Sequence, residues 1–188
     1  METYLAAHPD SESETLDACR RGDREAQRWF YDRYRTRVFS IALHYLRGDE
    51  AGAEDVTQEV FVKVFRSLSR FEAAARISTW LYRIVVNACH DELRRRRRLV
   101  FIGDTPNVDN LTVDPHDPMW EAEEIGRAVH ALAPKFRMVV LLRYFEDLSY
   151  DQIAEVLDTS AGTVASRLHR AHAALSQTLK HLNKRTEG

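Results

Sequence analysis

Residues 148–172 read LSYDQIAEVLDTSAGTVASRLHRAH and predict two short helices joined by a tight turn. Ser149, followed three residues later by Gln152, has the pattern of a capping box, which satisfies free amide groups at the start of a helix. Residues 158–160 (Asp-Thr-Ser) supply turn and cap chemistry before the second helix. The stretch therefore predicts a helix-turn-helix unit.

The second helix of this unit has two different faces. Apolar residues at helical spacing are expected to face the core, namely Val164, Leu168, Ala171 and Leu175. Polar and cationic residues are expected on the outer face, namely Thr163, Ser166, His169 and Arg170, with Arg167 at its edge. Such a face suits a DNA major groove. Most paired helices with a polar face bind no DNA, so the rest of the chain has to decide.

Length and composition allow one domain or two small ones, because the chain has 188 residues of which 44% are hydrophobic. No apolar run is long enough to cross a membrane, and the N-terminus lacks the pattern of a signal peptide. Two cysteines, Cys19 and Cys89, do not make a disulfide framework. We therefore expect a cytoplasmic protein without membrane insertion.

Charge is unevenly distributed along the chain, although the formal net charge is only -2. Residues 20–98 hold eighteen Lys or Arg against eleven Asp or Glu, whereas residues 1–19 and 99–120 are acidic and contain no Lys or Arg. Residues 121–188 are balanced, with nine of each sign. A basic block between acidic segments indicates one folded unit that faces phosphate.

The periodicity predicts an all-α chain of two small helical domains joined by a flexible acidic linker. The expected division is an acidic tail at 1–14, a first domain at 15–98, the linker at 99–120, a second domain at 121–182 and a tail at 183–188. The linker contains three prolines and shows no helical period. Helix breaks are expected at Gly22-Asp23 and Gly48-Asp49.

Residues 54–68 form the clearest amphipathic helix of the first domain. Its buried stripe is predicted to consist of Val56, Val60, Val64 and Phe65, with Phe61 and Leu68 alongside. Its surface is predicted to carry Asp55, Thr57, Gln58, Glu59, Val62, Lys63 and Arg66. After a loop at 71–76, Ser78 is expected to cap a further long helix that runs into five consecutive arginines at 94–98.

Two separated blocks can be compared together with a known family. The first block consists of EDVTQEVF at 54–61 and STWLYRIVVN at 78–87, and the second of LSYDQIAE at 148–155 and GTVASRLHRA at 162–171. In order and spacing they resemble the extracytoplasmic-function group of the sigma-70 family of bacterial transcription initiation factors. The resemblance covers roughly 15–98 and 121–180, and two blocks in the right order are far more specific than a lone helix-turn-helix.

The resemblance implies an alternative sigma factor that binds core RNA polymerase, recognises the −10 and −35 promoter elements and initiates transcription. It implies recruitment without covalent chemistry, so neither a cofactor nor a metal is expected. The implied partners are the clamp helices of the largest polymerase subunit, the flap of the second-largest subunit, and promoter DNA. A separate anti-sigma factor is expected to control the chain.

The resemblance also assigns residues to three surfaces. The surface for core polymerase comprises Asp55, Gln58, Glu59 and Val62. The −10 surface comprises Arg76, Thr79, Trp80, Arg83, Asn87, Asp91, Arg94 and Arg95. The −35 surface comprises Thr163, Ser166, Arg167, His169 and Arg170.

Residue chemistry refines these assignments. Asn87 offers a donor and an acceptor to a base edge, and the arginines suit phosphate. Trp80 is expected to pack in the core rather than to serve as a stacking platform, since aromatic residues at helical spacing usually do. Ala165 and His172 stand where this group commonly carries cations, which predicts weaker or altered −35 binding.

Two rival functions remain open at this level. A stand-alone helix-turn-helix regulator would need a sensing or dimerising domain, which the first domain does not resemble. An enzyme could be built on Cys89-His90, but adjacent helical residues point about 100° apart and no third ligand accompanies them. An incidental buried cysteine is the favoured interpretation, with any redox role for Cys19 or Cys89 a minor alternative.

Overall fold

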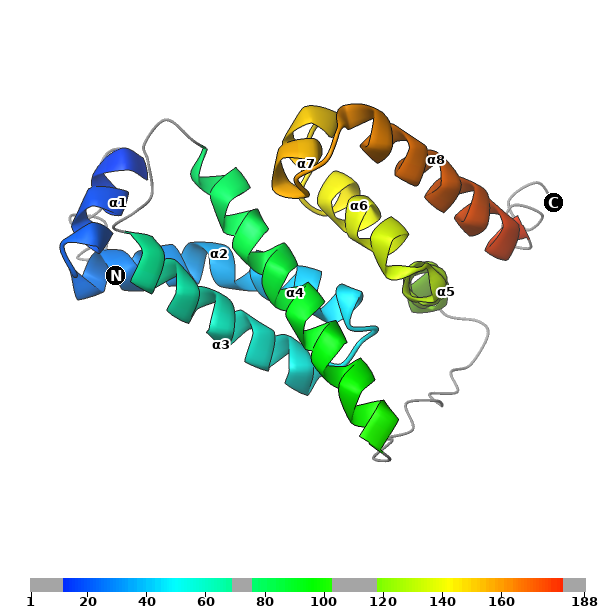
Figure 1. Cartoon of the computed structure of the whole chain (residues 1–188), viewed down its shortest axis with the longest axis horizontal. Helices are drawn as coiled ribbons and strands as arrows, with labels where there is room; N and C mark the ends of the chain where they lie inside the picture. The colour runs from blue at the N-terminus through cyan, green and yellow to red at the C-terminus, as the bar shows by residue number, and fades with distance from the viewer. Residues whose placement is uncertain (1–11, 69–75, 103–117, 181–188) are drawn as a thin grey trace.

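The structure, a computed structural model, describes residues 12–68, 76–102 and 118–180. These residues form eight α-helices and no strand (Figure 1). The helices are α1 (Glu12–Arg20), α2 (Arg24–Tyr45), α3 (Glu50–Ser67), α4 (Ile77–Ile102), α5 (Pro118–Ala131), α6 (Pro134–Tyr144), α7 (Tyr150–Val156) and α8 (Ala161–Thr178). The all-α prediction is confirmed.

In the first half, α2, α3 and α4 pack against one another, and α1 packs against α2 (Figure 1). The predicted stripe of α3 is buried, with Val56, Val60 and Val64 at 1% exposure or less. Thr57 was expected on the surface and is instead buried, so that expectation was wrong. Its hydroxyl donates to Ala53 O at 2.7 Å, an intrahelical bond that lets a short polar side chain face the core.

The helix breaks occur where the sequence predicts them. Gly22 has φ 83°, and the carboxylate of Asp23 then caps α2 by accepting from the amides of Glu25 and Ala26. Gly48 has φ 85°, and Asp49 caps α3 by accepting from the Gly52 amide. Positive φ is the conformation that glycine adopts without strain, so both turns follow from the local sequence.

Four helix ends differ from the sequence prediction. Helix α1 begins at Glu12, inside the segment expected to be a tail, and α4 begins at Ile77, which places Ser78 inside the first turn instead of at the cap. Helix α4 continues to Ile102 because no Gly or Pro occurs before Gly103. Helix α5 begins at Pro118, since proline is tolerated in a first turn. The rest of the predicted tails and linker, and the loop before Arg76, lie outside the described residues.

The second half, α5–α8, contains the predicted helix-turn-helix. Both members of the Ser149–Gln152 capping box are formed, and Ser160 caps α8 by accepting from the Thr163 amide. Asp158 adopts φ 48° in the turn, a left-handed conformation that aspartate tolerates better than most residues. Val164, Leu168 and Ala171 of α8 are buried as expected.

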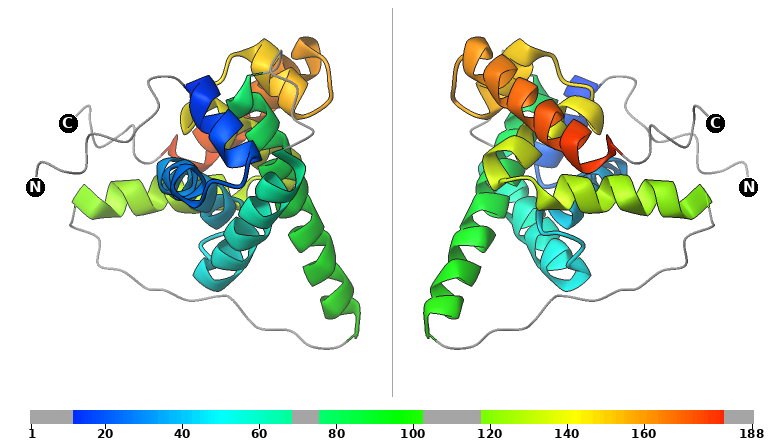
Figure 2. Two further views of the ribbon diagram at one scale, coloured as in Figure 1. Left: turned by 90° about the vertical axis from the view of Figure 1, so that its left-hand side faces the viewer. Right: turned by 90° about the vertical axis from the view of Figure 1, so that its right-hand side faces the viewer.

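The two halves pack against each other through α2 and α4 on one side and α5, α6 and α7 on the other (Figure 2). Arg137 of α6, 1% exposed, lies at this junction. Its guanidinium donates to Tyr45 O, at the end of α2, and to carbonyls of Val129, His130 and Leu132 at the end of α5. Helix C-termini leave carbonyls unpaired and carry partial negative charge, so one buried cation satisfies two helix ends.

Candidate nucleic-acid and protein-binding surfaces

The first candidate surface is a polar face on α3. Asp55, Gln58, Glu59 and Val62 are all exposed, Val62 by 46%. Their offsets of three, four and seven residues place them on one side of the helix. Glu59 forms an ion pair with Lys63 at 2.6 Å, but both side chains are more than 40% exposed. Such a pair adds little stability, so the face is free to meet a partner.

The second candidate surface follows the outer side of α4. Arg76, Arg83, Asn87, Asp91, Arg94 and Arg95 are exposed, as the sequence interpretation requires. Thr79 is only 1% exposed, and its buried hydroxyl has no hydrogen-bond partner. It therefore does not face solvent in this arrangement. Trp80 is half-buried and packs against the core, as the core interpretation expects, while part of the residue remains exposed.

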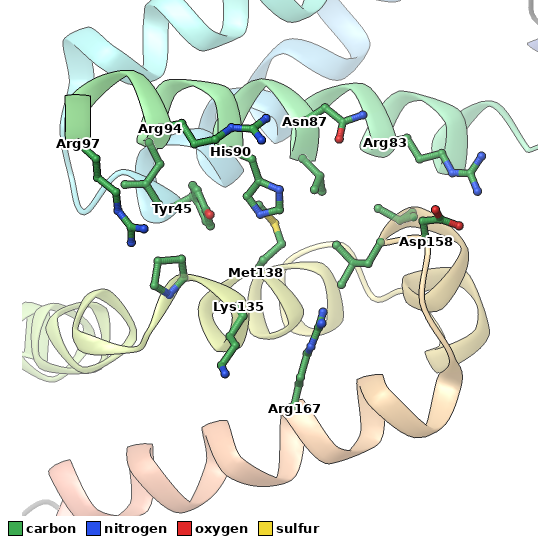
Figure 3. Close-up of a pocket in the computed structure, with 15 residues that line it drawn as sticks. Tyr45, Arg83, Asn87, His90, Arg94, Arg97, Lys135, Met138, Asp158 and Arg167 are labelled. Carbon is green, nitrogen blue, oxygen red and sulfur yellow. The ribbon is translucent and has the colours of Figure 1, made fainter. Parts of the chain in front are cut away.

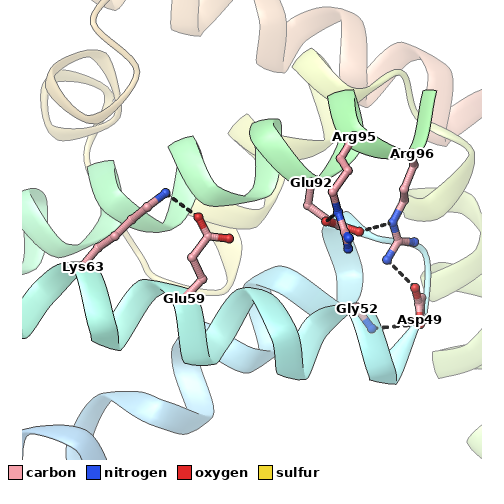
Figure 4. Close-up of polar contacts among 7 residues, drawn as sticks. All are labelled: Asp49, Gly52, Glu59, Lys63, Glu92, Arg95 and Arg96. Carbon is pink, nitrogen blue, oxygen red and sulfur yellow. Dashed lines mark hydrogen bonds and ion pairs between the residues drawn. The ribbon is translucent and has the colours of Figure 1, made fainter. Parts of the chain in front are cut away.

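Part of the arginine run of α4 is engaged within the protein (Figure 4). Glu92, whose side chain is 7% exposed, accepts from Arg95 and Arg96 at 2.7 Å each, and Arg96 also pairs with Asp49. Burial alone would raise the pKa of Glu92, but the two arginine hydrogen bonds lower it below its ordinary value. A Cβ at Gly52 would overlap the Arg96 guanidinium and the Asp49 carboxylate, so a side chain there would displace this ion pair.

These carboxylate contacts limit what the arginine run can do. Arg94 pairs with Asp91 on the same helix. Arg97 and Arg98 form no ion pair in the part of the chain that the structure describes. Sequence reasoning missed Glu92 and Asp49 as partners. For Glu92 a signal was present, since acids three and four residues before an arginine lie beside it on a helix.

The third candidate surface lies on α8. Ser166, His169 and Arg170 are exposed, whereas Thr163 and Arg167 are half-buried. The Thr163 hydroxyl lies 2.9 Å from the Ser160 hydroxyl at the helix start. His172 bonds the Tyr144 hydroxyl at 2.7 Å, which fixes its ring against α6. The exposed triad has the size and polarity expected of a helix that enters a major groove.

The second and third surfaces approach each other across the junction of the two halves (Figure 3). Arg83 Nε donates to Glu155 O of α7 at 2.9 Å, and the Tyr82 hydroxyl donates to Glu146. Asn87 lines a cavity of about 740 Å³ together with Arg167 of α8. The second half thus lies beside the part of α4 that carries Arg83, Asn87 and Arg94, although these three side chains remain exposed. Nothing in the periodicity pointed to this packing, because it depends on contacts between distant segments.

The cysteines do not offer catalytic chemistry. Both are free and buried, and burial, with a smaller contribution from Glu92, raises the pKa of Cys89 to about 12. Burial, with Asp23, raises the pKa of Cys19 to about 11. A thiol with so high a pKa is a poor nucleophile at neutral pH. Within the described residues no group of three or more potential metal ligands occurs, and none of the described helices has the length and apolarity needed to span a bilayer.

Comparison with known proteins agrees with the two-block pattern. A family model described as sigma-70 region 2 matches residues 30–99, and one described as sigma-70 region 4 matches residues 122–175. The extracytoplasmic-function RNA polymerase sigma factor SigW of Bacillus subtilis is 30% identical, over 87% of this chain and 94% of its own. The sigma-E factor of Haemophilus influenzae, of the same group, is 31% identical over 89% of this chain and 94% of its own.

Solved structures share the fold. The sigma factor RpoE of Bartonella quintana, in complex with the anti-sigma factor NepR, superposes with a TM-score of 0.70 at 22% identity, covering 81% of this chain and 96% of that one. CnrH in complex with the cytosolic domain of CnrY gives a TM-score of 0.69 at 23% identity, with 89% and 96% covered. At these identities the likeness establishes the arrangement of helices alone.

Proposed function

Because this chain belongs to the extracytoplasmic-function group of the sigma-70 family, we propose that it works through the three surfaces described above. It is an alternative RNA polymerase sigma factor and not an enzyme. It binds core polymerase and directs it to promoter DNA, where transcription begins. The assignment of residues to each of these steps is the part that we propose.

The exposed face of α3 is proposed to bind the clamp helices of the largest polymerase subunit. Support comes from its composition, since Asp55 and Glu59 offer carboxylates to a basic partner helix and Gln58 offers an amide. Val62 adds an apolar contact that is 46% exposed. An exposed face with an apolar centre and a charged rim is typical of a protein interface. The flap of the second-largest subunit would contact the second half.

Helix α4 is proposed to read the −10 element. Arg83, Asn87 and Arg94 lie on one side of the helix, where a base edge can be met by an amide flanked by two phosphate-binding arginines. This row is the observation that carries the proposal. Thr79 is buried and is removed from the set of groups proposed to contact DNA. Arg95 contributes less than its neighbours because Glu92 already holds it.

Helix α8 is proposed to read the −35 element through Ser166, His169 and Arg170, with Arg167 at the edge and Thr163 near phosphate. Arginine can bond guanine in a bidentate manner, which makes Arg170 the main candidate for base recognition. The ring of His172 is held by Tyr144, so it does not replace the cation that its family position commonly carries.

The two halves are proposed to separate before promoter binding. Asn87 is exposed but lines the cavity between the halves, so α7 and α8 would obstruct the approach of a duplex to this side of α4. Contacts across the junction, including Arg83 with Glu155 and Arg137 with Tyr45, would hold the free chain closed. Binding of each half to polymerase would open it, since a partner shifts an equilibrium by its preference for one state. An anti-sigma factor and a cytoplasmic location are further parts of the proposal.

Transcription with purified components tests this function. The chain added to core polymerase should yield promoter-specific transcripts from a promoter library, and no transcripts across that library would refute the proposal. A stand-alone regulator, the rival function, would bind DNA without binding core polymerase. A pull-down of core polymerase therefore separates the two.

The face of α3 can be tested in the same assay. Glu59→Lys should weaken binding to core polymerase, because it reverses a charge at the proposed interface. Glu50→Lys is the matched control and should bind as the unmodified chain does, because Glu50 is an exposed position of α3 that lies nine residues before Glu59 and therefore on the opposite side of the helix. Equal losses in both variants would remove the α3 face from the interface.

A further inference from the structure

The cavity between the two halves is unusually cationic (Figure 3). It measures about 740 Å³, within the range of small-molecule sites. Its lining includes five Lys or Arg residues, namely Arg83, Arg94, Arg97, Lys135 and Arg167. Asp158 is the one carboxylate among the lining residues. Like charges gathered in a partly enclosed space repel each other, so an anion bound there would stabilise the closed arrangement.

Two of these cations have no partner within the described part of the chain. Arg97 of α4 and Arg167 of α8 take part in no ion pair or hydrogen bond there, although they lie on opposite walls of the cavity. The pKa of His90, on the same wall as Arg97, is lowered chiefly by burial and then by Arg94 and Arg167, against the opposing effect of Asp91. The cavity therefore carries positive potential.

The start of α6 adds to this potential. Pro134 and Lys135, its first two residues, line the cavity, and Ala133 before them provides no side-chain cap. Pro134 has no amide hydrogen, and the amides of Phe136 and Arg137 donate to Ala133 O, so the start of α6 contributes the positive end of its helix dipole rather than a set of free donors. Asn87 and His90 add polar groups, and an apolar part of the lining is formed by Tyr45, Val86, Leu93, Met138, Val156 and Leu157. Arginines next to an apolar wall suit a ligand whose phosphate groups bind the arginines while an attached flat ring packs on the wall.

We propose that this cavity binds a small polyphosphate, with nucleoside triphosphates as the ligand class, and that the bound anion holds the two halves together. One end of the polyphosphate would contact Arg97 of α4 and another part Arg167 of α8, and a base would lie against the wall that includes Met138 and Val156. Because the ligand touches both halves, it binds the closed state better than the open one. It would thus compete with promoter DNA for the face of α4. Binding of the anion does not rest on the proposed function, whereas its competition with promoter DNA rests on the proposed −10 role of α4.

Calorimetric titration of the free full-length chain tests the site, without polymerase or promoter. Inorganic tripolyphosphate and ATP are the probes, at constant ionic strength. Tripolyphosphate should bind saturably at one site, and Arg97→Ala and Arg167→Ala should each weaken it about tenfold, as expected for a charge-assisted bond. The matched controls are Arg98→Ala on α4 and Lys180→Ala just after α8, both exposed cations outside the cavity lining.

The outcomes separate the alternatives. Controls that bind as the unmodified chain does support the site, and tighter binding of ATP than of tripolyphosphate assigns the apolar wall to the base. Equal affinities for ATP and tripolyphosphate would show that the phosphate groups alone are recognised, so that inorganic polyphosphate would also be a ligand. Absence of saturable binding, or equal losses in the controls and the cavity variants, would overturn the proposal. Circular dichroism of each variant verifies that the helices remain intact.

Discussion

Helices α4 and α8 carry the two surfaces proposed for DNA, and they differ in how accessible those surfaces are. On α8, Ser166, His169 and Arg170 are exposed to solvent. On α4, Arg83 is bonded to α7, and Asn87, although exposed, lines the cavity between the two halves. The comparison indicates that the −35 reader is available in the free chain, whereas the −10 reader becomes available after the halves separate.

The largest expected effect comes from the residue that joins the halves. Arg137→Met removes a buried guanidinium that bonds four backbone carbonyls, and it leaves two helix ends unpaired. We expect a loss of about 3–5 kcal/mol in the free energy of unfolding, as for breaking a buried ionic contact. Urea titration measures it.

The control for this variant is Arg127→Met, at an exposed position of α5. It should change stability by less than about 0.5 kcal/mol. Similar stabilities for the two variants would show that the halves are held together by other contacts. An Arg137→Met chain that keeps its helices but separates its halves would allow the accessibility of α4 and α8 to be compared without the contacts between the halves.

The next effect concerns DNA binding by the two helices. Arg170→Ala should weaken −35 binding by about 1–3 kcal/mol in the free chain and in the complex with polymerase, because its surface is open in both. Asn87→Ala should alter −10 base preference by a similar amount, but only in the complex with polymerase and not in the free chain. Binding measured by fluorescence anisotropy at fixed salt tests both. An effect of Asn87→Ala on the free chain would contradict closure.

A smaller effect is expected from pH. The pKa of His130, at the junction of the halves, is lowered from 6.5 to about 4 by burial first, and then by His44, Arg137 and Arg47. The folded chain thus binds a proton less readily than the unfolded chain. The stability contributed by neutral His130 is fully present above pH 6.5 and is lost as pH falls toward about 4.

Unfolding followed from pH 7 to pH 4 measures this dependence. His130→Gln should flatten the loss of stability, because no titrating group remains at that position. His169→Gln, at an exposed position of α8, is the control and should keep the slope of the unmodified chain. If stability fell with pH at the same slope in all three chains, His130 would not contribute to the pH dependence of stability.

The smallest effect is expected at Thr79. Its buried hydroxyl has no partner, so Thr79→Val should leave stability unchanged or raise it by about 1 kcal/mol. The −10 preference of the complex with polymerase should not change, since the side chain does not reach solvent. Thermal unfolding and a promoter-binding profile test the two parts. An altered base profile would return Thr79 to the DNA surface.

The comparison also explains which features the sequence can predict. The caps at Ser149, Ser160 and Asp23 depend on residues within one turn, and all three were found where expected. The buried stripe of α3 follows from periodicity in the same way. The family and the three candidate surfaces came from motifs that lie within single helices.

Features that hydrophobic periodicity does not encode were missed, some of them local and some decided by distant segments. Thr57 is buried because an intrahelical bond satisfies its hydroxyl, an option that periodicity does not register. Arg137 lies in the core because the ends of α2 and α5 meet there, and its partner Tyr45 is 92 residues away. The packing of the second half beside α4 likewise depends on contacts between distant segments, and the sequence of α4 alone does not predict it.

The distance between the two halves, in the free chain and on core polymerase, tests the central claim most directly. Labels attached at Arg28→Cys on α2 and Ala173→Cys on α8 report it by single-molecule energy transfer, since both positions are exposed and the native cysteines are buried. We predict one short-distance population in the free chain and a longer distance after core polymerase is added. A broad distribution in the free chain, or an unchanged short distance on polymerase, would contradict the account.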